Sequence, residues 1–473
     1  MLESCWKVWA TFAICAILLP SSSAQVFTTL VNFNGHDGSN PYYMSLAQGV
    51  DGNLYGTAEN GGAYSDGILF RATLQGAIRI YSFGNGNANG GMPYAGLVLG
   101  NDGNFYGTTT NGGNGFGTVF KVNPQGTLTT IHLFCAQPPY CEDGGQPWAA
   151  LIQGADGSFY GTAVEYGVNH GGTVFKINPA GTVTPLYSFC AMPNCIDGES
   201  PAAPLIQATD GNFYGTTSMG GNPICGPNGC GTVFRITPGG KLTTLHSFSS
   251  TDGYYPVAGL IQASDGNLYG ATSSGGGGGN GTIFKITQTG GFETLYSFCA
   301  QPNCTDGSGP YATLIQATDG NLYGTTSGGG VNGDGTVFSI GLNGALTTLH
   351  SFDETVAIPY GGVVQHTDGT FYGTTFEGGQ GCCNGILFSL STGLGPFVTF
   401  VHNSGKVGQT GSILGQGFIG TTSVSLNGTP ANFTVISDSY IQATVPPGAT
   451  TGYVTVTTPS GTLTSNVPFR VIP

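Results

Sequence analysis

The sequence predicts an all-β protein in which a seven-bladed β-propeller is followed by a small β-sandwich. Three observations carry this prediction: one phrase recurs seven times at a nearly constant period, each copy holds four short strand-like runs, and the repeat stops before the chain ends. A period near fifty residues with four antiparallel strands per unit is typical of a propeller blade. Glycine is abundant, but 39% of the 473 residues are hydrophobic, which is enough for a core.

The first element, residues 1–24, is predicted to be a secretory signal. Lys7 precedes an apolar stretch from Val8 to Leu19, and Ser22-Ser23-Ala24 fits a small-residue cleavage site. The apolar stretch is too short to span a bilayer, and no later segment is long enough. We therefore expect an exported protein that starts at Gln25, with no membrane span after cleavage. An uncleaved N-terminal anchor is the alternative.

The second element is the repeat of residues 25–391. Variants of Asp-Gly-Asn-Leu-Tyr-Gly-Thr begin at Asp51, Asp102, Asp156, Asp210, Asp265, Asp319 and Asp368. In the fifth copy the predicted strands are residues 258–263, 267–272, 281–287 and 292–298. Asp265-Gly266 is a hairpin signal between the first two, because such turns need residues with positive φ.

An offset at the two ends of the repeat predicts a closed ring. A fourth-strand run, residues 26–33, stands alone before the first complete copy, and the last copy, residues 360–391, has no clear fourth run. The N-terminal run can therefore complete the last blade. A linear solenoid, the rival interpretation, would have no use for this offset and would need capping units.

The repeat resembles a known family. Gln-Ala-Ser-Asp-Gly-Asn-Leu-Tyr-Gly (262–270), Gly-Thr-Ile-Phe-Lys-Ile (281–286) and Thr-Leu-Tyr-Ser-Phe (294–298) are similar to the GloVer tandem repeat of choice-of-anchor surface proteins. The resemblance covers roughly residues 26–391. It implies an exported, often surface-attached protein without a general catalytic role, although this chain has no obvious sorting tail.

Beyond a short linker, residues 392–396, the period disappears. Strand-like runs at residues 411–417, 423–426, 431–437, 440–445, 453–458 and 467–472 predict a β-sandwich over residues 397–473. Its phrases Gly415-Gln416-Gly417-Phe418, Val424-Ser425-Leu426-Asn427-Gly428 and Ala443-Thr444-Val445-Pro446 resemble an IPT/TIG immunoglobulin-like domain. That resemblance implies a spacer or interaction module.

Charge excludes one class of partner. The net charge is −14 with only ten Lys and Arg, so no cationic cluster is present to neutralise phosphates. We therefore expect no nucleic-acid partner, and an anionic membrane surface is disfavoured for the same reason. The expected partner is an unknown extracellular ligand, a glycan or a protein.

Cysteine usage agrees with export. After the leader, eight of ten cysteines form close pairs, which predicts the disulfides Cys135–Cys141, Cys190–Cys195, Cys225–Cys230 and Cys299–Cys304. The state of the adjacent Cys382 and Cys383 stays open. Zinc is disfavoured because the pairs lack metal-ligand spacing and lie far apart, and no metal site or cofactor is predicted.

Candidate binding residues gather on one face of the predicted ring. In a four-stranded meander, the loops between strands two and three share a face with the blade-to-blade loops, and these loops hold most of the variation. Variable loops on a rigid scaffold are where function usually lies. The candidate ligand-binding residues there are Trp148, Tyr140, Tyr254, Tyr255, Glu59, Glu165 and Glu377. The same loops hold Tyr42, Tyr43, Tyr94, Tyr311 and Tyr360. Such aromatic residues suit stacking on sugars, but they could equally pack between blades as core.

Other recurring residues have competing interpretations. Asp37, Asp143, Asp197, Asp252 and Asp306 recur as Asp-Gly-x-x-Pro, which fits plain turns better than a calcium ring. His132, His246 and His350 share a repeat position with Tyr81, Tyr187 and Tyr296, which indicates a structural position. The hydrolase motifs H-E-x-x-H and G-x-S-x-G are absent, and no catalytic residue is predicted.

The sequence thus favours an exported, non-catalytic binding or surface-interaction protein, with glycan binding through the variable face of the propeller as one form of it. Two alternatives stay open. One is an extracellular polysaccharide-active enzyme that uses Glu59, Glu165 and Glu377, and the other is a structural component of the envelope.

Overall fold

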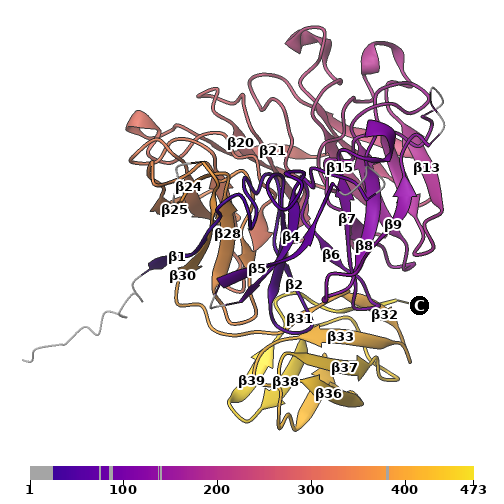
Figure 1. Ribbon diagram of the computed structural model, residues 1–473, viewed down its shortest axis with the longest axis vertical. Helices are drawn as coiled ribbons and strands as arrows, with labels where there is room; N and C mark the ends of the chain where they lie inside the picture. The colour runs from indigo at the N-terminus through magenta and orange to yellow at the C-terminus, as the bar shows by residue number, and fades with distance from the viewer. Residues whose placement is uncertain are drawn as a thin grey trace, which may run out of the picture.

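The computed structural model describes residues 25–73, 76–84, 89–136, 138, 141–379 and 383–472, which consist of strands and turns (Figure 1). The only helical elements in these ranges are four short 3-10 turns: η1 Gly113–Gly115, η2 Pro193–Cys195, η3 Pro223–Cys225 and η4 Pro302–Cys304. Within the described ranges, no helix is long and apolar enough to cross a bilayer. The all-β prediction is confirmed, and the expected leader, residues 1–24, lies outside the described residues.

Each repeat unit folds as a four-stranded antiparallel sheet, and the described chain holds seven of them in a propeller-like arrangement. The first three are β2–β5 (Ala47–Gln48, Leu54–Ala58, Ile68–Thr73, Gly76–Ser82), β6–β9 (Val98–Leu99, Phe105–Thr109, Thr118–Val122, Leu128–Leu133) and β10–β13 (Ile152–Gln153, Phe159–Ala163, Thr173–Ile177, Val183–Ser188). The next three are β14–β17 (Ile206–Gln207, Phe213–Thr217, Thr232–Ile236, Leu242–Ser247), β18–β21 (Ile261–Gln262, Leu268–Thr272, Thr282–Ile286, Phe292–Ser297) and β22–β25 (Ile315–Gln316, Leu322–Thr326, Thr336–Ile340, Leu346–Ser351). The seventh joins β27 (Val364–Gln365), β28 (Phe371–Thr375) and β30 (Ile386–Ser391) to the N-terminal β1 (Val26–Asn32), and β26 (Val356–Ala357) pairs with β29 (Glu377–Gly378) beside it.

The first strand of each unit is much shorter than the sequence predicts. In the fifth unit β18 is only Ile261–Gln262, whereas residues 258–263 were expected. The reason is that the chain before it bonds to the next unit: the amide of Gly259 donates to the hydroxyl of Thr313 at 2.9 Å. In five units a threonine hydroxyl also donates to the carbonyl of this segment in the next unit, as Thr216 does to Ala258 at 3.2 Å, so the segment joins neighbouring units rather than extending its own sheet.

The repeated phrase is explained by two local requirements, shown by the fifth unit. Asp265 accepts hydrogen bonds from the amide of Asn267 at 3.0 Å and from the hydroxyl of Tyr269 at 2.8 Å, which fixes the Asp-Gly turn onto the second strand. A Cβ on Gly270 would lie 2.6 Å from the ring of Phe284, so only glycine lets this ring pack across the sheet. The same Asp–Tyr bond recurs in every unit.

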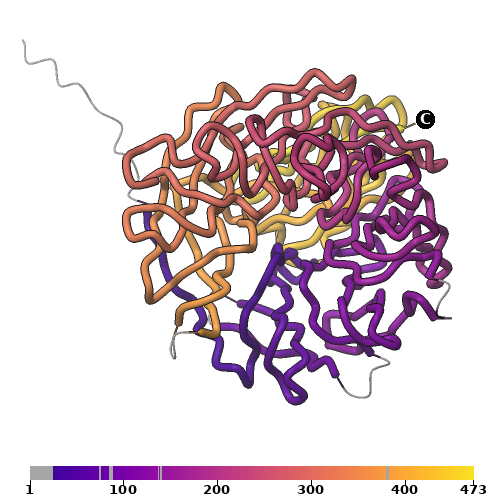
Figure 2. Tube along the Cα trace, turned by 90° about the horizontal axis from the view of Figure 1, so that it is seen from above, coloured from indigo at the N-terminus to yellow at the C-terminus, as the bar shows by residue number. Residues whose placement is uncertain are grey.

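The last unit and the first are joined by a strand pairing and by hydrogen bonds. β1 pairs with β30 antiparallel from Val26↔Ser391 to Asn32↔Ile386, and Figure 2 shows the indigo N-terminal segment beside the orange last unit. At one end of the ring, the amide of Asn40 donates to the carbonyl of Asn384 at 2.9 Å. At the other end, the side-chain oxygen of Gln48 accepts from the amide of Thr367 at 3.2 Å. The expected pairing of the N-terminal run with the last unit is therefore present.

Glutamines of the first strands form a chain of hydrogen bonds around the inside of the ring. The side-chain oxygens of Gln153, Gln207, Gln262, Gln316 and Gln365 each accept from a backbone amide in the preceding unit's turn. Gln48 makes the equivalent bond to the seventh unit, and only the second unit departs, with Leu99 at this position. These glutamines therefore join neighbouring units.

The C-terminal region consists of two four-stranded sheets and a parallel strand pair. One sheet is β31 (Thr399–Phe400), β33 (Thr410–Leu414), β37 (Tyr440–Thr444) and β36 (Phe433–Ser437); the other is β35 (Thr429–Pro430), β34 (Ser423–Leu426), β38 (Val454–Thr458) and β39 (Gly461–Thr464). β32 (Ser404–Lys406) pairs with β40 (Arg470–Ile472). Their buried side chains, including Ile413, Val424, Ile441 and Val456, form one core.

The C-terminal region lies against the end of the ring that carries the Asp-Gly turns (Figure 1). The hydroxyl of Ser439 donates to the carbonyl of Val50 at 2.8 Å, and Arg470 donates to the carbonyl of Thr209 at 2.6 Å. Leu99 belongs to the same apolar cluster as Leu414. The glutamine chain is therefore interrupted at a unit that packs against the C-terminal region.

Candidate functional site

The other end of the ring, called here the variable face, carries the sheet-to-sheet loops and the loops between second and third strands. In every unit, the loop that leads into the sheet contains a residue that is followed by proline. This residue has positive φ in all seven units: Asn40, Met92, Gln146, Ser200, Tyr255, Gly309 and Ile358. Each of these residues donates its amide to the preceding unit and accepts at its carbonyl from its own unit. The loops of this face are therefore held in a fixed, repeated geometry.

The residue four positions before the first strand of each unit differs in identity between units. An aromatic side chain occupies this position in five units, represented by Tyr43, Tyr94, Trp148, Tyr311 and Tyr360, whereas Ala202 and Val257 occupy it in the fourth and fifth. The first unit has one additional residue, Tyr42, in this loop. The small side chains of two neighbouring units therefore leave space on one side of a circle of otherwise aromatic residues.

A cavity of about 60 Å³ lies at this space, and we call it the axial pit. Aromatic walls come from Tyr43, Trp148, Tyr255 and Tyr311, and residues from all seven units line it. Among the described residues that line it, none carries a charge. Hydroxyl groups of Ser45 and Thr313 add polar atoms to the mainly apolar walls.

Trp148, one of the residues that line the pit, has an indole nitrogen without a hydrogen-bond partner among the described residues. Its Nε1 has no hydrogen-bond acceptor, although it is shielded from solvent. An unsatisfied buried donor costs roughly 1–3 kcal/mol.

Tyr43 and Tyr255 sit in surroundings that keep their phenols neutral. Burial, followed by the charge of Tyr42, raises the pKa of Tyr43 well above its usual value, and burial likewise raises the pKa of Tyr255. Both hydroxyls are therefore available as neutral donors and acceptors at any physiological pH.

Glu59 occupies a position where most units hold a small side chain. The equivalent hydroxyls of Thr110, Ser218, Ser273 and Ser327 each donate to the carbonyl of the positive-φ residue of their own unit. Glu59 instead accepts a hydrogen bond from the hydroxyl of Tyr94, and burial raises the pKa of its carboxyl group. Tyr94 in turn meets Trp148 edge to face, with ring centroids 6.0 Å apart. Glu59 thus supports the wall of the pit from behind.

The structure brings together only some of the seven residues proposed from the sequence. Trp148 and Tyr255 line the pit, and Glu59 supports it through Tyr94. Tyr254 packs against the apolar cluster that contains Cys230, and Glu165 is exposed in the third unit. Two further residues lie elsewhere: Glu377 is half-buried near Tyr360, and Tyr140 lies outside the described residues.

Some aromatic side chains of this face pack as core. The ring of Tyr42 contacts those of Tyr43, Tyr94, Tyr360 and Phe376, with centroids 4.2–5.4 Å apart. Tyr43 and Tyr311, in contrast, line the pit although they were not among the candidate residues. Their shared position, four residues before the first strand of their unit, was the signal that could have identified them.

The recurring aspartates of the sheet-to-sheet loops hold those loops in place. Asp197 accepts from the hydroxyl of Tyr187 at 2.9 Å and from two backbone amides, and Asp306 repeats this pattern with Tyr296. In other units a histidine takes the place of the tyrosine, as His246 does with Asp252 at 3.0 Å. The exchange of His and Tyr among these units therefore preserves one hydrogen bond to a carboxylate, which is present for His132, Tyr187, His246 and Tyr296.

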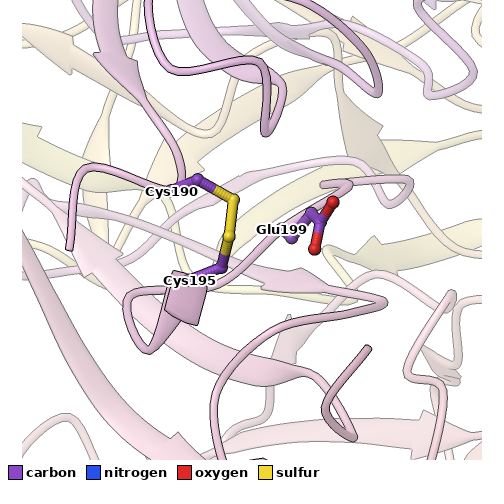
Figure 3. A group of neighbouring side chains, drawn as sticks. All are labelled: Cys190, Cys195 and Glu199. Atoms are coloured by element: carbon purple, nitrogen blue, oxygen red, sulfur yellow. A yellow bond between two sulfur atoms is a disulfide. The ribbon is translucent and has the colours of Figure 1, made fainter. Parts of the chain in front are cut away.

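Four disulfides fasten loops of the variable face: Cys135–Cys141, Cys190–Cys195, Cys225–Cys230 and Cys299–Cys304. Cys383 is exposed, and its neighbour Cys382 lies outside the described residues. The ligand atoms of Cys190, Cys195 and Glu199 lie within 4.8 Å of one another, the one such group in the described chain (Figure 3). Because both sulfurs are joined to each other, they are unavailable as thiolate ligands.

Comparison with protein families gives one match. The sequence model of the Gloeobacter/Verrucomicrobia repeat matches residues 18–223, 78–263, 139–303 and 224–435, which overlap and together span most of the chain. No curated protein sequence matches significantly.

Solved structures share the fold at low sequence identity. Extracellular domains assigned to two hybrid two-component systems of B. thetaiotaomicron are 14% and 13% identical, with TM-scores of 0.52 and 0.51. The alignments cover 92% and 91% of this chain but 46% and 52% of those chains, so the chain spans about half their length. A fungal alcohol oxidase of the AA5 family, in complex with copper, is 13% identical with a TM-score of 0.53, and 95% of this chain and 100% of that one are covered. These likenesses concern the fold alone.

Proposed function

The chain belongs to the Gloeobacter/Verrucomicrobia repeat family, and from this membership and the axial pit we propose that it is an exported, non-catalytic protein that binds a glycan at its variable face. The single observation that carries the proposal is the pit itself, in which Trp148, Tyr255 and Tyr311 surround a cavity whose described lining residues carry no charge. Aromatic faces with a few polar groups are what ligand pockets commonly present.

The architecture that we propose around the pit is a closed seven-bladed β-propeller with an IPT/TIG-like immunoglobulin domain at residues 397–473. Ring closure is supported by the pairing of β1 with β30. It is also supported by the hydrogen bonds that join the first and last units at both ends of the ring. The C-terminal domain would act as a spacer that occupies the opposite end of the ring. This leaves the variable face open to a ligand.

Export is supported by the four disulfides on the variable face, because disulfides persist in oxidising compartments. A cleaved leader of residues 1–24 would remove Trp6 and Trp9 and leave Trp148 as the sole tryptophan of the mature protein. Localisation at the cell surface or in the medium is part of the proposal.

An enzymatic role for Glu59, Glu165 and Glu377 has less support. Glu59 is held by Tyr94 behind the pit wall, and none of the three glutamates lines the pit. We therefore propose binding without turnover.

The test is a fluorescence titration of residues 25–473 with a panel of soluble polysaccharides. Trp148 emission should shift and saturate with at least one neutral glycan. By calorimetry, Tyr255→Ala should weaken that binding at least about tenfold, since truncating an aromatic anchor costs roughly 2 kcal/mol. Tyr64→Ala is the matched control, because Tyr64 is exposed on a loop of the same face but outside the pit. Equal weakening by both changes, or no binding by any glycan, would contradict the proposal.

A further inference from the structure

We propose that the axial pit receives the end of an uncharged glycan chain, one sugar ring deep, rather than gripping a chain along its length. This inference rests on the proposed function and adds the ligand's charge and its direction of entry. Three properties of the pit carry it: it is blind, it is small, and its walls are uncharged.

The pit is blind because its lining stops at the beginning of the innermost strands. Its described walls include Ser45, Gly96, Ala149, Pro204 and Gly362, but no glutamine of the hydrogen-bonded chain deeper in the ring. The far end of the ring is occupied by the C-terminal region, through contacts such as Ser439 to Val50. A polymer therefore cannot pass through the ring, and only a terminus can enter it.

The size of the pit limits what can enter. Its volume of about 60 Å³ corresponds to roughly four to six water positions, since one water needs at least 10–15 Å³ on this measure. Tyr43 and Trp148 narrow the pit, whereas Ala202 and Val257, at the equivalent loop position in their units, leave space. Only one ring of a chain can be buried there, with the next sugar at the mouth.

The walls favour an uncharged sugar. The described residues that line the pit carry the hydroxyls of Tyr43, Ser45, Tyr255, Tyr311 and Thr313 as side-chain polar groups, and the indole nitrogen of Trp148 is shielded. Among the described lining residues there is no cation for a uronate and no carboxylate for an amino sugar. Burying an unpaired charge is strongly unfavourable, whereas the uncharged hydroxyls of a sugar can bond to the hydroxyl groups of the residues that line the pit.

The first experiment compares ligands with and without chain ends. One calorimetric titration compares the binding of linear maltohexaose with that of cyclomaltohexaose. A second compares each neutral polysaccharide that shifts Trp148 emission with fragments obtained from it by acid hydrolysis. If the protein binds chain ends, each end binds with the same affinity. At equal mass, the fragments should therefore bind better than the intact polymer, in proportion to the number of chain ends that they contain. Better competition by the intact polymer, or equal binding of the cyclic sugar, would overturn the inference while leaving glycan binding in place.

The second experiment tests charge and fit. Oligogalacturonate should bind at least about tenfold more weakly than a neutral oligosaccharide of equal length, since one unpaired buried charge is unfavourable. Ala202→Phe should fill the pit and weaken neutral binding at least about tenfold, while Ala63→Phe, on an exposed loop of the same face, should not. An unchanged near-ultraviolet spectrum and unfolding midpoint establish that Ala202→Phe is folded. Preferred binding of the polyuronate, or normal binding by folded Ala202→Phe, would refute the inference alone, whereas no binding by any glycan would refute the proposed function as well.

Discussion

Tyr94 donates its hydroxyl hydrogen to the carboxylate of Glu59, and this bond connects a half-buried acid to the wall of the axial pit. Burial and the neighbouring charge of Glu59 raise the pKa of Tyr94 to about 12, so its proton stays in place at neutral pH. Because the ring of Tyr94 meets Trp148, Glu59 acts as a positioning residue for the indole.

The Glu59–Tyr94 bond can be tested by the emission of Trp148. Glu59→Ala should free the Tyr94 hydroxyl, shift the emission maximum and reduce stability by about 0.5–1.5 kcal/mol, the net worth of one hydrogen bond. Glu59→Gln keeps an acceptor oxygen and should leave the emission unchanged. Identical spectra for both variants and the natural protein would show that Glu59 does not position the indole.

The raised pKa of Glu59 predicts a dependence of stability on pH. The folded protein holds this proton more tightly than the unfolded chain, so the group's stabilising contribution is complete below its ordinary value of 4.5 and is lost as pH rises through the raised value. Glu59→Gln should therefore be more stable than the natural protein at pH 7, and the difference should shrink as pH falls toward 4.5. Chemical unfolding at several pH values measures this, and a constant difference would contradict it.

His246 predicts the opposite trend in mild acid. Burial lowers its pKa, only partly offset by Asp252, so the stability linked to its neutral form is present above 6.5 and is lost as pH falls through the lowered value. His246→Tyr restores the residue that other units carry and should reduce the loss of stability between pH 7 and 5. Thermal unfolding should show no such change for His36→Tyr, because the His36 side chain is 73% exposed.

The glycine of the repeated phrase should tolerate no side chain. In Gly215→Ala the new methyl would lie 2.7 Å from Phe234 and 2.8 Å from Leu205, and such overpacking costs roughly 1–3 kcal/mol. Gly277→Ala is the matched control, because nothing lies within 4 Å of the position that its new methyl group would take and its φ is not positive. Urea unfolding should separate the two variants, and equal stabilities would refute the packing argument.

Leu99 should be needed for docking of the C-terminal region. Leu99→Gln restores the residue of the other units but places a polar group in the cluster that holds Leu414, at a cost of about 1–3 kcal/mol. We expect earlier proteolytic release of the C-terminal region. Val407→Gln, at a site that is 49% exposed, should leave the cleavage rate unchanged.

Much of the fold could be predicted because the period of the repeat and the offset at its two ends indicate how many sheets form and how the first strand pairs. The period indicated the seven sheets, and the lone run at residues 26–33 predicted the partner of β30. The lengths of the first strands were wrong, since Gly259 bonds to the next unit rather than extending β18, and such bonds between units leave no period-two pattern.

The site was only partly predictable. Trp148 and Tyr255 were identified because they lie in variable loops, but the pit depends on Ala202 and Val257, whose contribution is the absence of a large side chain. A missing large side chain leaves no motif in the sequence by which the pit could be recognised. Glu165 was grouped with Glu59 by loop position, although the sheet of the second unit lies between theirs in the ring.

The pairing of β1 with β30 has a consequence for how the chain acquires its structure. The strand made first is the last to be placed, because its partner belongs to the final unit. Contacts so distant in sequence form slowly, and until they form, β30 presents an unpaired edge to solvent. Two chains that refold together at high concentration can each supply this strand to the other, giving an exchanged dimer in which every sheet is intact.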